Sequence, residues 1–129
     1  MNQQGSQRQN RDQQNRDQQN RQMRGQQSQQ QLQQATAALQ TDQVKAQAIA
    51  QTNQTAYSLL FPSDWMVIKF VETQVPVAAD WTTYRANVRT VAADTKTAIT
   101  AATTVDEVAA IMSSIVWPVS PDAPVQNGE

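Results

Sequence analysis

The sequence predicts an all-α fold, and three observations support this prediction. Residues 29–60 contain no glycine or proline and are rich in glutamine, alanine and leucine, which have good helix propensity. The later apolar residues recur at steps of three and four, the period of an amphipathic helix. Proline and capping signals at Pro62, Pro76 and Thr104 then divide this second part. We expect an extended N-terminal Gln-rich arm and a helix, followed by a small three-helix module.

Residues 1–31 form a low-complexity arm of glutamine, asparagine and arginine. A pentad, Gln-Asn-Arg-Asp-Gln, repeats from Gln9, and this period matches neither a helix nor a strand. The arm has no apolar face, with only Met23 inside it. The sequence favours disorder in the free protein, because little buried surface would offset the ordering entropy. The alternative is an arm ordered by docking in a larger assembly, where amide side chains pair with backbone or with one another.

Residues 32–61 are expected to be an amphipathic helix. Its candidate seam follows alternating steps of three and four and consists of Leu32, Ala35, Leu39, Asp42, Ala46, Ile49, Asn53, Ala56 and Leu60. Two interpretations stay open, a coiled coil along this seam or a single helix packed on its own domain or on a neighbour. From this segment we select Leu32, Leu39 and Ile49 as candidate partner-binding residues.

The small helical module spans residues 62–118. Ser63 is expected to cap a first helix from Asp64 to about Thr73, although residues 65–71 would also suit a strand. The buried face of this helix is expected to comprise Trp65, Met66, Ile68, Phe70 and Val71. The segment 74–76 is expected to be a loop.

A second helix is expected from about Asp80 to Ala101, and a third from Val105 to about Ile115. The apolar stripe of the second helix consists of Trp81, Tyr84, Val88, Val91, Thr95, Ala98 and Ala102, with Ile99 beside it. Thr104 and Glu107 match a capping box that starts the third helix. The apolar side of the third helix consists of Val105, Val108, Met112 and Ile115. Residues 119–129 are expected to be an extended tail.

Aromatic and basic residues give the remaining candidate contacts. We interpret the three tryptophans as core residues, because a module of this size needs large apolar side chains. Trp117, followed by Pro118, is also the best candidate for a partner contact, since aromatic residues are enriched at interface hot spots. Arg85 and Arg89 lie one helical turn apart. They would face water, form a salt bridge with one of the acids Asp64, Glu72 and Asp94, or bind an acidic partner surface.

The composition argues against an enzyme. The 129 residues include no histidine and no cysteine, which removes the usual general base and the thiolate metal ligand. The three glycines form no phosphate-binding loop, so we expect no catalytic, cofactor or metal site. No apolar run approaches the roughly 20 residues of a membrane span, and we expect no membrane partner. The arginines of the arm are diluted by Asp12 and Asp17 and lack aromatic neighbours, which argues against a nucleic-acid partner.

Charge is distributed unevenly along the chain. Residues 1–55 hold six basic and three acidic side chains, a net charge of +3. Residues 56–129 hold four basic and eight acidic side chains, a net charge of −4. Opposite ends of neighbouring copies would attract each other, so we expect a homo-oligomer.

Several short motifs of the module resemble a known family. Asp64-Trp65, Val75-Pro76, Trp81, Tyr84-Arg85-Ala86, Val88-Arg89 and Ile115-Val116-Trp117-Pro118 occur in an order that resembles the C-terminal module of tailed-phage tail-fibre assembly proteins and related tail-assembly chaperone-like modules. The resemblance covers roughly residues 57–121. The Gln-rich arm and the longer spacing across residues 95–104 depart from the family.

The resemblance implies a bacteriophage virion structural protein, associated with the tail or the tail fibre. Such a protein is made in the host cytoplasm and resides in the virion, where its N-terminal arm and helix dock on other virion structural proteins. The departures favour a protein that is retained in the particle. A tail-fibre assembly chaperone that is not retained in the virion, and a capsid decoration protein, are the alternatives.

Overall fold

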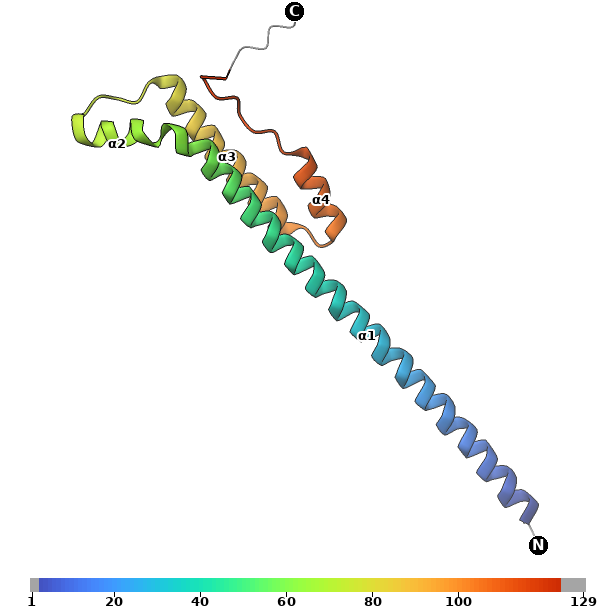
Figure 1. The fold of residues 1–129 in the computed structure, drawn as a ribbon. Helices are drawn as coiled ribbons and strands as arrows, with labels where there is room; N and C mark the ends of the chain where they lie inside the picture. The colour runs from blue at the N-terminus through green and yellow to red at the C-terminus, as the bar shows by residue number, and fades with distance from the viewer. Residues whose placement is uncertain (1–2, 124–129) are drawn as a thin grey trace, which may run out of the picture. The chain divides into compact units, whose positions relative to one another are not determined.

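The computed structural model describes residues 3–123, and all regular elements in this range are helical (Figure 1). They are α1 (Gln3–Leu60), the 3-10 helix η1 (Phe61–Ser63), α2 (Asp64–Thr73), α3 (Ala79–Ala101) and α4 (Val105–Ser114). The all-α prediction is therefore confirmed, and the alternative strand at residues 65–71 is wrong because this segment lies in α2. Residues 124–129 of the predicted tail lie outside the described residues.

The chain divides into two compact units, Met1–Gln40 and Thr41–Glu129. In the first unit, residues 3–40 belong to α1, and every one of their side chains is exposed. The expectation of an extended or disordered arm is therefore wrong for residues 3–31, which are helical. Good helix propensity and the absence of proline decide the conformation here, and the five-residue period of the sequence does not prevent it.

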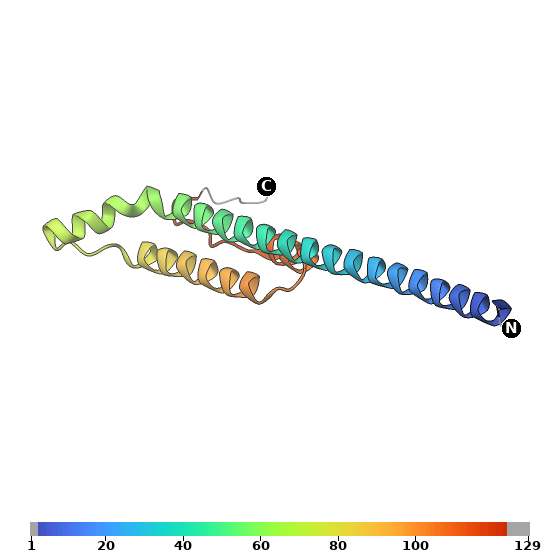
Figure 2. The same ribbon diagram turned by 90° about the horizontal axis from the view of Figure 1, so that it is seen from below.

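The second unit begins at Thr41 and includes the last part of α1, whereas the sequence placed the start of the compact module at Pro62. Both views show α3 lying alongside residues 41–60 of α1 (Figures 1 and 2). One core cluster comprises Ala48, Ile99, Ala102 and Val108, with Val44, Ile49, Ile111 and Met112 packed around it. The other comprises Ala56, Tyr84, Val88 and Ala92, with Leu59, Leu60, Trp81 and Trp117 around it.

The buried face of α3 lies close to the predicted stripe but is turned slightly from it. The buried residues of α3 are Tyr84, Val88, Ala92, Thr95 and Ile99. Val91 is half-buried and Ala98 is exposed, so these two predicted positions lie at the edge of the face or outside it. Ala92 of α3 and Ala56 of α1 belong to the same buried cluster, where small side chains suit the packing of two helices.

The capping box before α4 is confirmed, with a shift of one residue in its second half. The Glu107 backbone N–H donates to Thr104 Oγ1 at 3.1 Å, as expected of an N-cap threonine. The Glu107 carboxylate accepts from the Thr103 backbone N–H at 2.7 Å, and therefore reaches one residue beyond the cap. Helix α4 ends at Ser114, and Val108 is its one buried residue. Both backbone contacts fix the direction in which the chain enters α4.

Candidate interaction surface

The junction between α1 and α2 is held by a half-buried arginine, Arg85. Arg85 Nη1 donates to the Leu60 carbonyl oxygen at 2.8 Å and to Ser63 Oγ at 2.7 Å, and it lies 3.0 Å from Asp64 Oδ1. Ser63 is fully buried, and its hydroxyl donates to the Leu60 carbonyl at 3.1 Å. Of the three acids predicted as possible salt-bridge partners of Arg85, Asp64 is the one that forms the salt bridge. Because a planar guanidinium can contact several oxygens at once, Arg85 fixes the angle at which α2 leaves α1.

Ser63 precedes α2 as predicted, but it does not cap the helix through its side chain. The Ser63 hydroxyl is already engaged with Leu60 and Arg85. Pro62 occupies the 3-10 turn between the helices, where its missing N–H is tolerated. The bend between α1 and α2 therefore depends on the proline and on the arginine contacts.

Tyr84, next to Arg85, strengthens the same junction. Its ring is buried beside Trp81 in an edge-to-face contact with ring centroids 5.6 Å apart. Its hydroxyl donates to the Leu59 carbonyl in a long hydrogen bond of 3.5 Å. Burial removes water from the phenol, and this desolvation raises the pKa of Tyr84 above its ordinary value.

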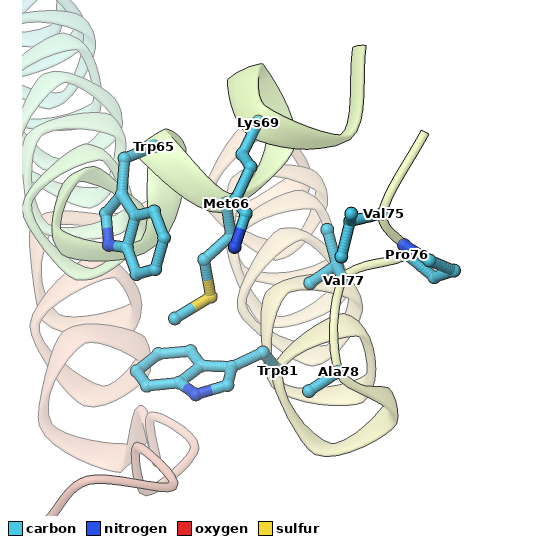
Figure 3. A pocket seen from close by; sticks show the side chains of 8 residues that line it. All are labelled: Trp65, Met66, Lys69, Val75, Pro76, Val77, Ala78 and Trp81. Carbon is cyan, nitrogen blue, oxygen red and sulfur yellow. The ribbon is translucent and has the colours of Figure 1, made fainter. Parts of the chain in front are cut away.

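A groove opens between α2 and the start of α3 (Figure 3). Its volume is about 250 Å³, and it is lined by Trp65, Met66, Lys69, Val75, Pro76, Val77, Ala78 and Trp81. Figure 3 shows the side chains of Trp65, Met66 and Trp81 directed toward one another. Lys69 is the only charged residue of the lining. A groove of this kind suits an apolar or aromatic side chain of another protein.

The rest of α2 presents an apolar surface that the described residues cover only in part. No residue of α2 is buried. Val67 is 38% exposed, Phe70 40% and Val71 67%, and these three residues follow the i, i+3, i+4 spacing of one helix face. We call Val67, Phe70 and Val71 the outer face of α2. The prediction that Trp65, Met66, Ile68, Phe70 and Val71 form a buried face is wrong, and so is the interpretation of Trp65 as a core residue, since it is 57% exposed.

The structure places the seven predicted partner-binding residues in different environments. Leu32 and Leu39 are exposed at 67% and 63%, as a docking role requires. Ile49 packs against the Ala48 cluster. Arg85 is engaged in the junction, while Arg89 one turn later is exposed. Trp117 and Pro118 are half-buried, with Trp117 packed against the Tyr84 cluster and Pro118 lining a shallow pocket on α3.

Two polar residues that the sequence reasoning missed organise the second unit. Lys45 Nζ donates to the carbonyl oxygens of Thr100 and Ala102, both at 2.8 Å, at the C-terminal end of α3. A cation at this end also complements the helix dipole. Thr52 is buried in α1, and its hydroxyl donates to the Ala48 carbonyl at 2.8 Å. Lys45 and Thr52 lie one helical turn before and after Ala48, on the same side of α1. This spacing along the helix could have identified them.

Two further properties bear on the kind of site. Among residues 3–123, no group of three potential acidic, histidine or cysteine ligands could hold a metal ion. Within the same residues, none of the helices combines the length and apolar character needed to cross a membrane. The comparisons with known proteins add no relative, because no family model, curated protein or solved structure matches the chain.

Proposed function

We propose that the chain is a structural protein of a bacteriophage particle, associated with the tail or the tail fibre, and that it acts by non-covalent docking. The observation that carries the proposal is the helix of residues 3–40, in which every side chain is exposed. A helix without a buried face gains no stability from packing within its own unit. Contacts with other virion proteins would supply this packing.

The charges of the two units support assembly into many copies. Residues 1–40 carry five arginines and two aspartates, a net charge of +3. Residues 41–129 carry five basic and nine acidic side chains, a net charge of −4. Opposite net charges favour encounters between the first unit of one copy and the second unit of another. Several weak contacts of this kind add up in a multi-copy particle.

The phage setting is supported only by the sequence resemblance of residues 57–121 to tail-fibre assembly modules. Mass spectrometry of gradient-purified particles of the phage that encodes the chain tests it directly. We expect its peptides in a fixed ratio to other structural proteins of the particle. If these peptides are abundant in infected cells and absent from purified particles, the proposal of a virion component is wrong.

A pair of matched variants tests whether the exposed leucines dock the chain. Leu32→Asp combined with Leu39→Asp places two charges at the exposed apolar positions. Gln33→Asp combined with Gln40→Asp adds the same charge at neighbouring exposed positions of α1. We expect the leucine variant to be lost from particles and the glutamine variant to be retained. Equal incorporation of both variants would exclude a docking role for Leu32 and Leu39.

The groove of α2 favours one alternative, a tail-fibre assembly chaperone. An exposed apolar groove with two tryptophans could hold a segment of a fibre protein before assembly. For this alternative we expect Trp65→Ala to reduce the yield of assembled fibres, with the chain present in complexes of infected cells and absent from finished particles. Normal fibre assembly with the Trp65 variant would contradict it.

A further inference from the structure

The two sides of α3 carry opposite charges. Asp80 and Asp94 are exposed and fourteen residues apart, close to four helical turns, so they lie on the same side. The basic residues lie on the opposite side at spacings of four and seven, and they are Arg85, Arg89 and Lys96. Within the described residues neither aspartate forms an ion pair. One side of α3 therefore presents negative charge to a partner.

Two shallow pockets follow one another along the acidic side of α3. The first has a volume of about 600 Å³ and lies between residues 79–87 of the helix and residues 118–121. The second has a volume of about 300 Å³ and lies between residues 91–98 and residues 111–116. Each pocket contains one of the two aspartates, and neither contains a basic residue. We call the two pockets together the α3 groove.

The two halves of the α3 groove differ in polarity. On the helix, the first half presents the polar side chains Asp80, Thr83 and Asn87. The second half is mainly apolar, and its apolar lining consists of Val91, Ala98, Ile111, Ile115 and Val116. Val116 is 81% exposed, so this apolar surface is accessible to a partner. A helix that fits the α3 groove would therefore carry cations followed by apolar side chains on one face.

The first unit of the chain has such a face. Leu32, Ala35 and Leu39 follow steps of three and four and form an exposed apolar strip, which we call the leucine strip. Arg21 and Arg24 precede the leucine strip on the same side of α1. No acidic residue lies between Arg21 and Leu39. The order of charge and apolar surface in this region is the one that the α3 groove requires.

We infer that the leucine strip of one copy packs into the α3 groove of a second copy, with the two helices parallel. Leu32 and Leu39 are seven residues apart. Val91 and Ala98, which line the second pocket, are also seven residues apart. Because helices of equal spacing stay in step when they pack side by side, both leucines would lie in the apolar half of the groove.

The charges favour this alignment. Arg21 precedes the first leucine of the strip by eleven residues, and Asp80 precedes the first of these pocket residues by the same number. The alignment therefore places Arg21 beside Asp80, where their charges are complementary. The acids nearest to the strip lie outside the contact. Asp17 would lie beyond the N-terminal end of α3, and Asp42 about 10 Å past Asp94, a distance at which salt screens most of the repulsion.

This inference rests on the proposed function, docking through residues 3–40, and names a second copy as one partner. Its tests use the purified full-length chain, so their failure would leave the particle test unaffected. The chain contains no cysteine, and single-cysteine variants therefore report one contact each. A tagged Leu39→Cys chain is mixed either with Ala98→Cys, in the second pocket, or with Ala93→Cys, an exposed alanine of α3 outside both pockets.

Under mild oxidation we expect the tagged chain to form mixed disulfide dimers several-fold faster with Ala98→Cys than with Ala93→Cys. The difference should disappear in denaturing urea, where the thiols meet by random collision. Equal rates in native buffer would overturn the inference. A faster reaction with Ala93→Cys would also overturn it, because it would place the contact on another side of α3.

Sedimentation equilibrium of the cysteine-free chain gives an independent reading. We expect the apparent mass to rise with concentration above that of one chain, 14.3 kDa, and to rise less at high salt. Arg21→Glu should reduce this rise more than Arg8→Glu, which changes the charge equally outside the strip. Adding Asp80→Arg to Arg21→Glu should restore it, with circular dichroism confirming equal helicity.

Three results would contradict the contact or its alignment. A monomer at all concentrations would show that a second copy is not the partner. Equal effects of Arg21→Glu and Arg8→Glu would show that only the overall charge matters. A folded double variant that stays as weakly associated as Arg21→Glu alone would separate Arg21 from Asp80.

Discussion

Residues 3–40 and residues 41–123 are both helical, but different interactions determine their structure. In the first region every side chain is exposed, so only intrinsic propensity and neighbouring side chains support the helix. In the second region two apolar clusters connect α1, α3 and α4, and the half-buried Arg85 of α3 contacts the end of α1. One continuous helix can therefore be a core element over part of its length and an exposed surface over the rest.

The largest expected difference between the regions comes from removing an apolar side chain. Ile99 is fully buried, and Ile99→Ala should lower the free energy of unfolding by about 2–5 kcal/mol. Leu39 is 63% exposed, and Leu39→Ala should change it by less than about 0.5 kcal/mol. Urea unfolding followed by circular dichroism measures both values. Equal losses would show that the first region is packed in solution.

The stability of the junction between α1 and α2 should depend on Arg85 and not on Arg89. Arg85→Ala leaves Ser63 and Asp64 without their partner, and should cost about 2–3 kcal/mol of stability. Arg89→Ala, one turn later on an exposed position, should cost less than about 0.5 kcal/mol. Thermal unfolding of the two variants makes the comparison, and similar midpoints would contradict the anchoring role of Arg85.

The start of α4 offers a smaller test. Thr104→Ala removes the hydroxyl that accepts from the Glu107 N–H, and should cost about 1 kcal/mol. Thr97→Ala removes an exposed threonine inside α3 and should have a much smaller effect, because this hydroxyl bonds only to a carbonyl of its own helix. Urea unfolding distinguishes the two. No loss in the Thr104 variant would mean that α4 does not need its cap.

The turn after α2 should become more stable with glycine. Gln74 has φ of 60°, a conformation that costs side-chain-bearing residues about 1 kcal/mol and that glycine adopts freely. Gln74→Gly should therefore raise stability by about 0.5–1 kcal/mol. Gln47→Gly, inside α1, should lower it by about 1 kcal/mol. In thermal unfolding we expect a higher midpoint for Gln74→Gly and a lower midpoint for Gln47→Gly. A lower midpoint for both variants would contradict the left-handed conformation of Gln74.

The burial of Tyr84 should make stability sensitive to alkaline pH. The folded protein raises the pKa of this phenol above its ordinary value of 10.0, because burial disfavours the charged form. The neutral phenol is favoured in the fold, so its contribution is complete below the unfolded pKa and is lost as the pH rises through the folded pKa. Tyr84→Phe should reduce the loss of stability above pH 10. If the stability of the unmodified chain and of Tyr84→Phe declines identically above pH 10, groups other than Tyr84 cause the decline.

The features that could be predicted from the sequence are those set by local chemistry. The capping box at Thr104 and the boundaries of α2 are of this kind. The sequence did not determine the partner of Arg85, because three acids were candidates for a salt bridge. In the structure the partner is Asp64.

The predictions that failed needed information about what lies opposite each face. The apolar composition of α2 predicted burial, but within residues 3–123 Val71 remains 67% exposed. The heptad seam from Leu32 to Leu60 assumed a packing partner along the whole helix. Leu32 lies where every side chain is exposed, whereas Ala56, on the same predicted seam, is buried in the second unit. No local signal in the sequence reports where the packed part of α1 begins.

Amide hydrogen exchange of residues 3–40, measured in the purified chain and in assembled particles, tests the docking claim most directly. Without packing partners these amides should exchange within short times in the free chain, while those of residues 84–99 should be protected. On assembly, residues 3–40 should become protected. Strong protection of residues 3–40 in the free monomer, or no gain of protection in the particle, would contradict docking through this region.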